Sequence, residues 1–272
     1  MTDQSTDAER QVPRALAEPT VHVRPAWITG LTLGNMGMWM ASLAALQFLL
    51  PAQIQDITPR HKFVALGVVS ALGAVASVLA TPVAGALSDR TTRAFGFGRL
   101  RGRRHRWTLV MALLGGICLA IQGYQTTIAG VAIFWVLFSA FQNGEFASLS
   151  AAIPDHVPVK QRATVAGWVG MPQALGLVVG AFLLADVVTG TISGYVTLAV
   201  LFFVLVIPFV LLTEDHPLDR EHREPLSWRQ LVGAYWISPR EYPDFRRNSA
   251  PSCHRLVGIA VTARARIAER SR

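Results

Sequence analysis

The sequence predicts an all-α membrane protein with six transmembrane helices, and three observations lead to this fold class. Six apolar runs follow one another in the chain, and each has the roughly 20 residues that a helix needs to cross about 30 Å of hydrocarbon. Hydrophobic residues make up 51% of the 272 residues, while the charges fall in short blocks between the runs. One such block places seven arginines within residues 90–106. A soluble protein would spread its charges over its surface.

The predicted spans are joined by short connections. In chain order they are Trp27–Leu50, Phe63–Leu87, Trp107–Tyr124, Ile128–Ile153, Val165–Val188 and Ile192–Leu212. Buried helices of a soluble protein are the alternative, but six such runs in succession with hairpin-length connections favour a membrane bundle. Residues 1–25 are polar and lack the features of a cleaved secretory signal, so the first span is expected to act as an uncleaved insertion signal.

The basic residues predict the orientation of the bundle. They gather in the N-terminal arm and after the second and fourth spans, whereas the other connections carry only Arg60 and Lys62. Short loops rich in lysine and arginine stay in the cytoplasm. We therefore expect a cell-membrane protein with both termini cytoplasmic. The net charge of +8 is explained by these loops, and no nucleic-acid partner is expected.

Common catalytic and cofactor motifs are missing from the sequence. It has no GxxxxGK[ST] phosphate loop, no paired-cysteine metal site and no G-x-S-x-G nucleophile elbow. Its cysteines, Cys118 and Cys253, offer no disulfide framework. The seven histidines lie outside the predicted spans, where we expect them to be solvated. The sequence thus predicts no enzymatic reaction, no metal and no cofactor.

The segment from Gly85 to Arg90 reads Gly-Ala-Leu-Ser-Asp-Arg and is followed by the arginine cluster. It resembles the signature between helices two and three of the major facilitator superfamily, although the spacing from Asp89 to the main cluster is longer. The following Thr-Thr and Phe-Gly pairs are similar to its glycoside-pentoside-hexuronide and sucrose-type sugar carriers. A weaker resemblance, over residues 153–158 with Arg162, matches the loop between helices four and five. The likeness covers residues 25–245 and implies one six-helix half of a two-half transporter.

An aspartate at the cytoplasmic end of a helix needs a cationic partner, because the helix dipole disfavours negative charge there. The resemblance implies that Asp89 and Arg90 act as a latch that holds the cytoplasmic side shut. It places Gly85 in the same signature and makes Asp155, with Arg162 nearby, a candidate for an added charge contact. The alternative is that Asp89 merely ends a helix and that Arg90 extends to the membrane surface.

Polar side chains inside spans are costly and therefore mark cavities. We expect the solute-binding residues to be Asn35, Trp39, Gln142, Asn143 and Gln173. Amide groups would bind hydroxyls while Trp39 stacks on an apolar sugar face. The glycines of these spans, such as Gly176 and Gly180, are expected to serve helix packing, since small residues let membrane helices approach closely, and a role in rocking is the alternative.

Glu145 is predicted to lie near the middle of the fourth span. Burial disfavours the charged form of a carboxyl and can make its protonation reversible. We expect Glu145 to couple transport to a proton or sodium. The alternative is a structural carboxyl that is bonded to a neighbouring helix. Asp186, at the outer end of the fifth span, is expected to be a solvated interfacial charge.

The predicted domains are a disordered arm (1–25), the bundle (26–212), an interhalf linker (213–245) and a basic tail (246–272). The tail has seven arginines, no lysine and one acidic residue. We expect it to be out-of-frame sequence after a truncation near residue 245. A basic segment that binds anionic lipid is the alternative.

The predicted function is solute transport, with a parallel homodimer supplying both halves. A non-transporting fragment or an accessory subunit is the alternative.

Overall fold

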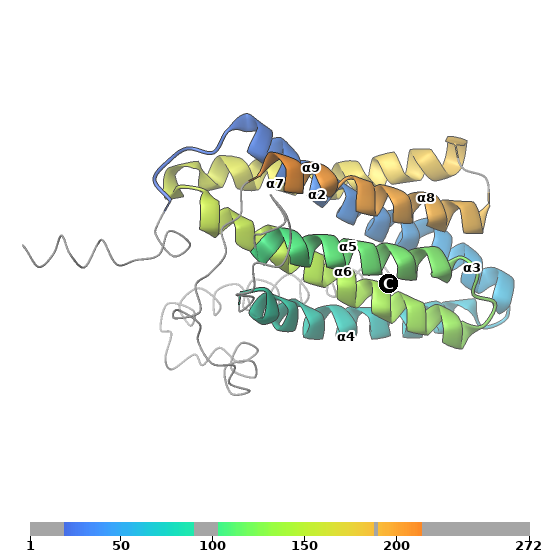
Figure 1. Cartoon of the computed structure of the whole chain (residues 1–272). Coiled ribbons are helices and arrows are strands. Elements are labelled where there is room, and N and C mark those ends of the chain that lie inside the picture. Colours follow the sequence, from blue (N-terminus) through green and yellow to red (C-terminus); the bar gives the residue numbers. More distant parts are fainter. Residues whose placement is uncertain (1–18, 90–102, 188–189, 214–272) are drawn as a thin grey trace, which may run out of the picture. The chain divides into compact units, whose positions relative to one another are not determined.

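The computed structural model describes residues 19–89, 103–187 and 190–213, and these residues are almost entirely helical. Six helices are long and apolar enough to cross a membrane: Pro25–Ile57, Lys62–Leu87, Arg104–Gln122, Ile128–His156, Val159–Asp186 and Thr191–Leu212. The helices run side by side in alternating directions (Figure 1). The predicted six-helix membrane bundle is confirmed. The arginines at 90–101, residues 1–18 of the arm and residues 214–272 lie outside the described residues.

The first span changes helical form partway along its length. Helix α2 (Pro25–Ala44) passes into a π-helical turn, η1 (Ala45–Leu49), and continues as α3 (Leu50–Ile57). Proline has no backbone N–H and its ring crowds the preceding turn, so Pro51 at the start of α3 favours the wider turn before it. The span therefore runs seven residues beyond the predicted end at Leu50, to Ile57.

The remaining elements follow with short connections. They are α4 (Lys62–Asp89), α5 (Arg103–Gln122), α6 (Ile128–His156), α7 (Val159–Phe182), η3 (Leu183–Val187), α8 (Thr191–Val204) and α9 (Ile207–Leu212). The Thr127 hydroxyl accepts a hydrogen bond from the Gly130 N–H (3.2 Å) and caps the start of α6. Gly190 directly precedes α8 and has a φ of 98°, a conformation that favours glycine.

The start of the third span differs from the prediction. Trp107 was expected to begin it and the preceding arginines to lie in the loop, but α5 begins at Arg103. Arginine is a good helix former, and no glycine or proline interrupts residues 103–107. Arg104 is consequently buried in the bundle, with 4% of its surface exposed.

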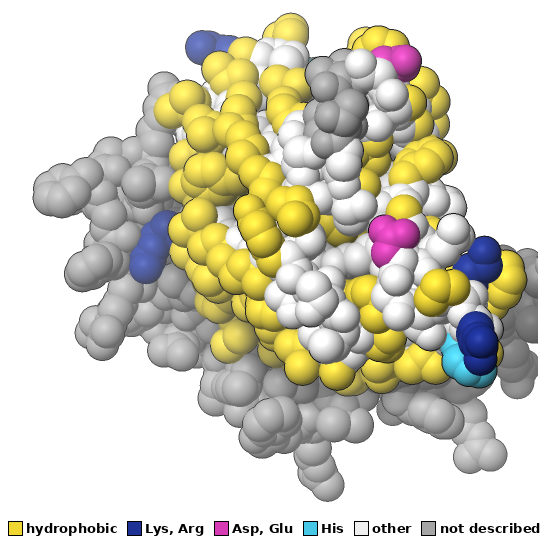
Figure 2. Space-filling model, turned by 90° about the vertical axis from the view of Figure 1, so that its right-hand side faces the viewer, with side chains coloured by type: hydrophobic (Ala, Val, Ile, Leu, Met, Phe, Trp, Pro, Cys, Tyr) yellow, Lys and Arg dark blue, Asp and Glu magenta, His cyan; other side chains and the backbone are white. Residues whose placement is uncertain are grey.

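The core lies where α6 packs against α4 and α5, and where α2 packs against α7, α8 and α9. Phe138 of α6 lies between Trp135 and Phe202, with ring centroids 5.6 and 5.8 Å apart. Figure 2 looks along the helices at the end of the bundle that lies on the right in Figure 1, where hydrophobic, uncharged polar and a few charged side chains share the surface. Large hydrophobic side chains such as Leu79, Val178 and Val200 are exposed along the spans, and such a surface suits a hydrocarbon environment.

Two glycines of α7 allow close contact with α2. A Cβ at Gly176 would lie 2.8 Å from the Met40 backbone N, and one at Gly180 would lie 2.6 Å from the Ala44 Cβ. Both distances are shorter than van der Waals contact. The Gly176–Gly180 spacing therefore serves helix packing inside the bundle, as small residues do in membranes.

Gly176→Ala is expected to destabilise the bundle by about 1–3 kcal/mol, the usual cost of overpacking. The added methyl group would meet backbone atoms of Met40, which cannot rotate away. Gly170→Ala is the matched control, because a Cβ there has nothing within 4 Å. Thermal unfolding in detergent would check this: equal unfolding temperatures for the two variants would contradict the packing role.

Candidate functional site

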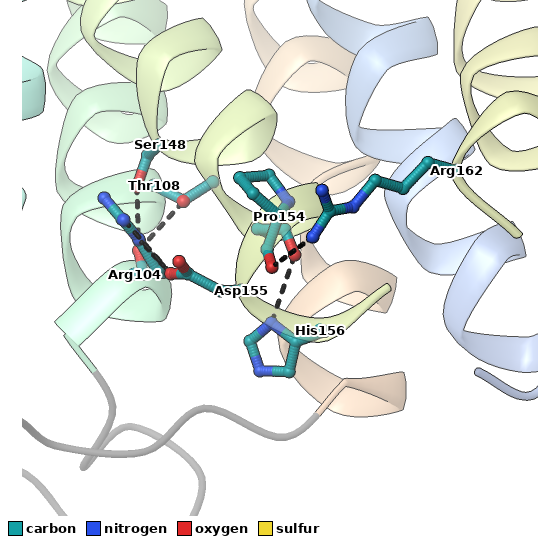
Figure 3. A network of polar contacts seen from close by, with 8 residues as sticks. Arg104, Thr108, Ser148, Pro154, Asp155, His156 and Arg162 are labelled. Carbon is teal, nitrogen blue, oxygen red and sulfur yellow. Dashed lines mark hydrogen bonds and ion pairs between the residues drawn. The ribbon is translucent and has the colours of Figure 1, made fainter. Parts of the chain in front are cut away.

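An ion pair joins α5 and α6 at the end of the bundle where α5 begins and α6 ends (Figure 3). Arg104 Nη2 and Nε each lie 3.1 Å from Asp155 Oδ2. The Arg104 side chain is 5% exposed and that of Asp155 is 22% exposed. The contact is a charge-assisted hydrogen bond in a poorly hydrated place, where such bonds are strong.

The backbone of Arg104 is fixed by two hydroxyls. Thr108 Oγ1 donates to the Arg104 carbonyl at 2.9 Å, and Ser148 Oγ of α6 donates to the same carbonyl at 3.2 Å. Main chain and side chain of Arg104 are thus both bound to α6. This arrangement holds the first turn of α5 against the last two turns of α6.

Arg162 lies on the other side of the α6 end. Its Nε donates to the Val157 carbonyl at 3.0 Å, and its Nη2 donates to the Pro154 carbonyl at 3.4 Å. A cation suits this place because the last carbonyls of a helix carry partial negative charge. The structure thus brings Asp155 together with Arg104, while Arg162 stabilises the end of α6.

The predicted latch pair can be placed only in part. Gly85 lies in α4, and a Cβ added there would meet nothing within 4 Å. Asp89 is the last residue of α4, but its side chain lies outside the described residues, as does Arg90. The contact between Asp89 and a cation therefore stays a prediction.

His105 is a correction to the expectation of solvated histidines. It is 1% exposed, and its ring lies edge-on to Phe209 with centroids 5.3 Å apart. Its Nε2 lies 2.6 Å from Thr213 Oγ1. Because the Thr213 hydroxyl donates its proton to the Phe209 carbonyl, it accepts from His105 Nε2. The burial follows from the earlier start of α5, which carries His105 into the bundle beside the end of α9.

The N-terminal segment is bound to the same end of the bundle. Gln161 Oε1 accepts from the Val23 N–H at 3.0 Å, and Gln161 Nε2 donates to the Val23 carbonyl at 3.3 Å. Trp27 lies near the His156 ring, with centroids 5.9 Å apart. The starts of α2, α5 and α7 and the ends of α6 and α9 therefore meet at one end.

The predicted solute-binding residues do not form a single group. Asn35 is 1% exposed and its Nδ2 donates to the Leu31 carbonyl of its own helix at 2.9 Å. Gln142 is 7% exposed. Gln173 is exposed on α7. Trp39 and Asn143 are half-buried on α2 and α6.

Trp39 and Asn143 have neighbours that define their surroundings. Trp39 lies edge-on to Phe146 of α6, with centroids 6.1 Å apart. Asn143 Nδ2 donates to Ser77 Oγ of α4 and to the Ser139 carbonyl, both at 2.8 Å. These two residues bring an aromatic face and an amide to partly accessible positions on α2 and α6.

Glu145 is completely buried, and neither carboxyl oxygen has a hydrogen-bond partner among the described residues. Phe138 comes seven residues before Glu145 and Leu149 comes four residues after it. These spacings place all three residues on the same face of α6. Phe138 contacts Phe202 of α8, and the Leu149 side chain lies against Gly34 of α2. The carboxyl thus lies on the side of α6 that faces α2 and α8.

Sequence reasoning missed the role of Arg104 and a polar cluster of Gln53, Gln122 and Tyr195. Arg104 was counted among the loop arginines, and the signal that could have found it is the uninterrupted helix-forming run before Trp107. Gln53 and Gln122 lie at or near the ends of apolar runs. Their burial depends on which helices meet, so no sequence pattern singles them out.

Comparison with known proteins gives one match. The family model described as Major Facilitator Superfamily matches residues 33–249. No curated protein and no solved structure matches the chain. The family model thus spans well over half of the chain, and it includes all of the described helices except the first part of α2.

Proposed function

This chain belongs to the Major Facilitator Superfamily, a family of membrane transporters, and from that premise we propose that it forms one six-helix half of a secondary transporter. It moves a small, sugar-like solute by alternating access, and a proton or sodium drives the movement. The observation that carries this proposal is Glu145, a membrane carboxyl with no exposed surface and no bonded oxygen.

A carboxyl without a partner is costly in a poorly hydrated place when it is charged, and much less so when it is neutral. A structural carboxyl would be expected to bond to a neighbouring helix, as Asp155 does with Arg104. Glu145 shows no such bond among the described residues. Its surroundings therefore favour exchange of a proton or cation over a fixed structural contact.

Trp39 and Asn143 are the residues best placed to meet the solute. Both are half-buried, while Asn35 and Gln142 are covered almost completely. An indole face stacks on the apolar face of a sugar, and an amide bonds to its hydroxyls. The pairing supports a sugar-like solute, while the Asn35 amide is bonded to a carbonyl of its own helix.

The Arg104–Asp155 pair supports a gate at the end of the bundle where α5 begins and α6 ends. It fixes the start of α5, directly after the segment that carries Arg90. In our proposal this anchor positions Asp89 and Arg90 as the latch, and the latch opens as two halves rock. The basic residues at this end support a cytoplasmic location for it and for both termini.

Helices α4 and α7 supply faces for a second half. Four glycines would place a new Cβ in open space, namely Gly67, Gly85, Gly167 and Gly170, and they lie on these two helices. The exposed amide of Gln173 follows Gly167 and Gly170 at three-residue spacing on α7. Small residues and a polar side chain suit contact with another protein helix better than contact with lipid. We propose a second, parallel copy as the partner.

Gly170→Trp is expected to block pairing of the two copies and to reduce transport, because the indole would occupy the helix contact. Its folding should be normal, since the position is open. Leu113→Trp is the matched control, because Leu113 is 47% exposed on α5, away from the proposed contact. Native mass measurement in lipid would check the prediction. A dimer that survives Gly170→Trp but not Leu113→Trp would overturn this choice of face.

The test of the proposed function measures mass and transport on one sample. The chain is purified in native lipid, its mass is determined, and sugar-driven proton or sodium uptake is measured in vesicles. A dimer with uptake supports the proposal. A monomer without uptake favours the alternative of a non-transporting fragment or an accessory subunit.

A further inference from the structure

We propose that Gln53, Gln122 and Tyr195 form a buried binding site for water. The site lies at the end of the bundle opposite the Arg104–Asp155 pair, where α3 and α5 end and α8 begins (Figure 1). Gln53 is 4% exposed, and Gln122 and Tyr195 are 0% exposed. These three residues are referred to below as the polar cluster.

The geometry brings the polar cluster together from three elements. Gln53 Nε2 of α3 donates to the Gln122 carbonyl at 2.7 Å and to the Gln125 carbonyl at 3.0 Å. The end of α5 packs on the start of α8, because a Cβ at Gly123 would lie 3.2 Å from the Tyr195 Cβ. The Tyr195 hydroxyl faces the Gln122 amide, but their geometry falls short of a hydrogen bond.

Four buried polar atoms of the cluster have no hydrogen-bond partner among the described residues. They are Gln53 Oε1, Gln122 Oε1, Gln122 Nε2 and the Tyr195 hydroxyl oxygen. A buried polar group without a partner is costly, and buried polar atoms are nearly always bonded to protein or water. Four such atoms in one place therefore point to a bound ligand that supplies the missing bonds.

The chemistry of the four atoms selects water. Two are amide oxygens that accept, one is an amide nitrogen that donates, and the hydroxyl can do both. A water molecule donates two hydrogen bonds and accepts two, and buried waters usually have about three polar partners. Water can therefore bond to every one of the four atoms.

A metal cation fits the polar cluster less well. The cluster contains no carboxylate, and Gln122 Nε2 presents a donor that a cation would repel. A hard cation needs six or more oxygen ligands, whereas the unbonded side-chain oxygens number three. Water bound at the polar cluster would join α3, α5 and α8 through one hydrogen-bond network. This end of the bundle would then move as a unit.

The test is radiolytic hydroxyl labelling of the full chain in lipid nanodiscs. Hydroxyl radicals arise from water, so a buried ring is labelled when a water molecule is bound beside it. We expect labelling of Tyr195 although it is 0% exposed, with Tyr124, 62% exposed, as the positive control. Phe202 is the matched negative control, because it is also 0% exposed on α8 but packs against Phe138.

Gln122→Leu removes two of the four unbonded atoms and leaves the backbone carbonyl that Gln53 binds. Labelling at Tyr195 should then fall about fivefold, the factor that corresponds to one net hydrogen bond. If this variant does not fold, Tyr195→Phe removes the hydroxyl alone, and labelling at position 195 should fall by a similar factor.

Three results would overturn the proposal. Tyr195 could stay unlabelled while Tyr124 is labelled, which would mean a dry cluster. Labelling could be unchanged by both substitutions, which would mean that its water does not depend on these side chains. Labelling that disappears when sodium or potassium is added would assign the site to a cation instead.

Discussion

Glu145→Gln is expected to abolish solute-driven proton uptake while the amount of protein in the membrane stays unchanged. Glutamine has the size of glutamic acid but cannot release or take up a proton. Folding should be preserved, because the substitution removes no bond between Glu145 and the described residues. Uptake is measured with a pH-sensitive dye in vesicles at equal protein density.

Two control variants sharpen this result. Glu145→Asp keeps a titratable group and should retain measurable coupling. Asp186→Asn removes a carboxyl that is exposed in η3 and should leave uptake unchanged. Coupled uptake at the wild-type rate in Glu145→Gln would contradict the proposed role of Glu145. Loss of the protein from the membrane would instead identify Glu145 as a structural carboxyl.

Asp155→Ala is expected to destabilise the bundle by about 3–5 kcal/mol, the cost of removing one partner of a buried ion pair. The loss leaves Arg104 charged and only 5% exposed. Arg104→Met should cost less, because the remaining Asp155 is 22% exposed and can be hydrated in part. Thermal unfolding in detergent measures both changes.

The double variant tests whether the pair acts as a unit. Arg104→Met combined with Asp155→Ala should be more stable than Asp155→Ala alone, because no unpaired charge is left in the bundle. Arg162→Met is the matched control, since Arg162 contacts backbone carbonyls rather than a carboxylate and should cost about 1 kcal/mol. Fully additive effects of the two substitutions would contradict a coupled pair.

Stability and transport can be separated in the same variants. If the Arg104–Asp155 pair anchors a latch, Asp155→Ala should also lower the fraction of protein that is closed at this end, in addition to its effect on unfolding. Accessibility of a cysteine introduced at Gly85, which lies in open space in α4, would report on that opening. Unchanged accessibility would restrict the pair to a structural role.

The sequence by itself determined the number of membrane helices and the family of this protein. Apolar runs near 20 residues in length specify spans one by one, because each helix must satisfy its backbone within the bilayer on its own. The Gly85–Arg90 signature identified the family that the comparison shows. These features are local in the chain, so they can be read without knowing which helices touch.

Tertiary structure decided which polar residues meet and how deeply they are buried. Asp155 could have paired with any of several arginines, and it was the earlier start of α5 that brought Arg104 to it. His105 was expected in solvent but is covered by Phe209 and Thr213. Gln53, Gln122 and Tyr195 are far apart in the chain and converge only where α3 and α5 end and α8 begins. Burial of a side chain depends on packing between helices, and packing is a property of contacts that periodicity and composition do not specify.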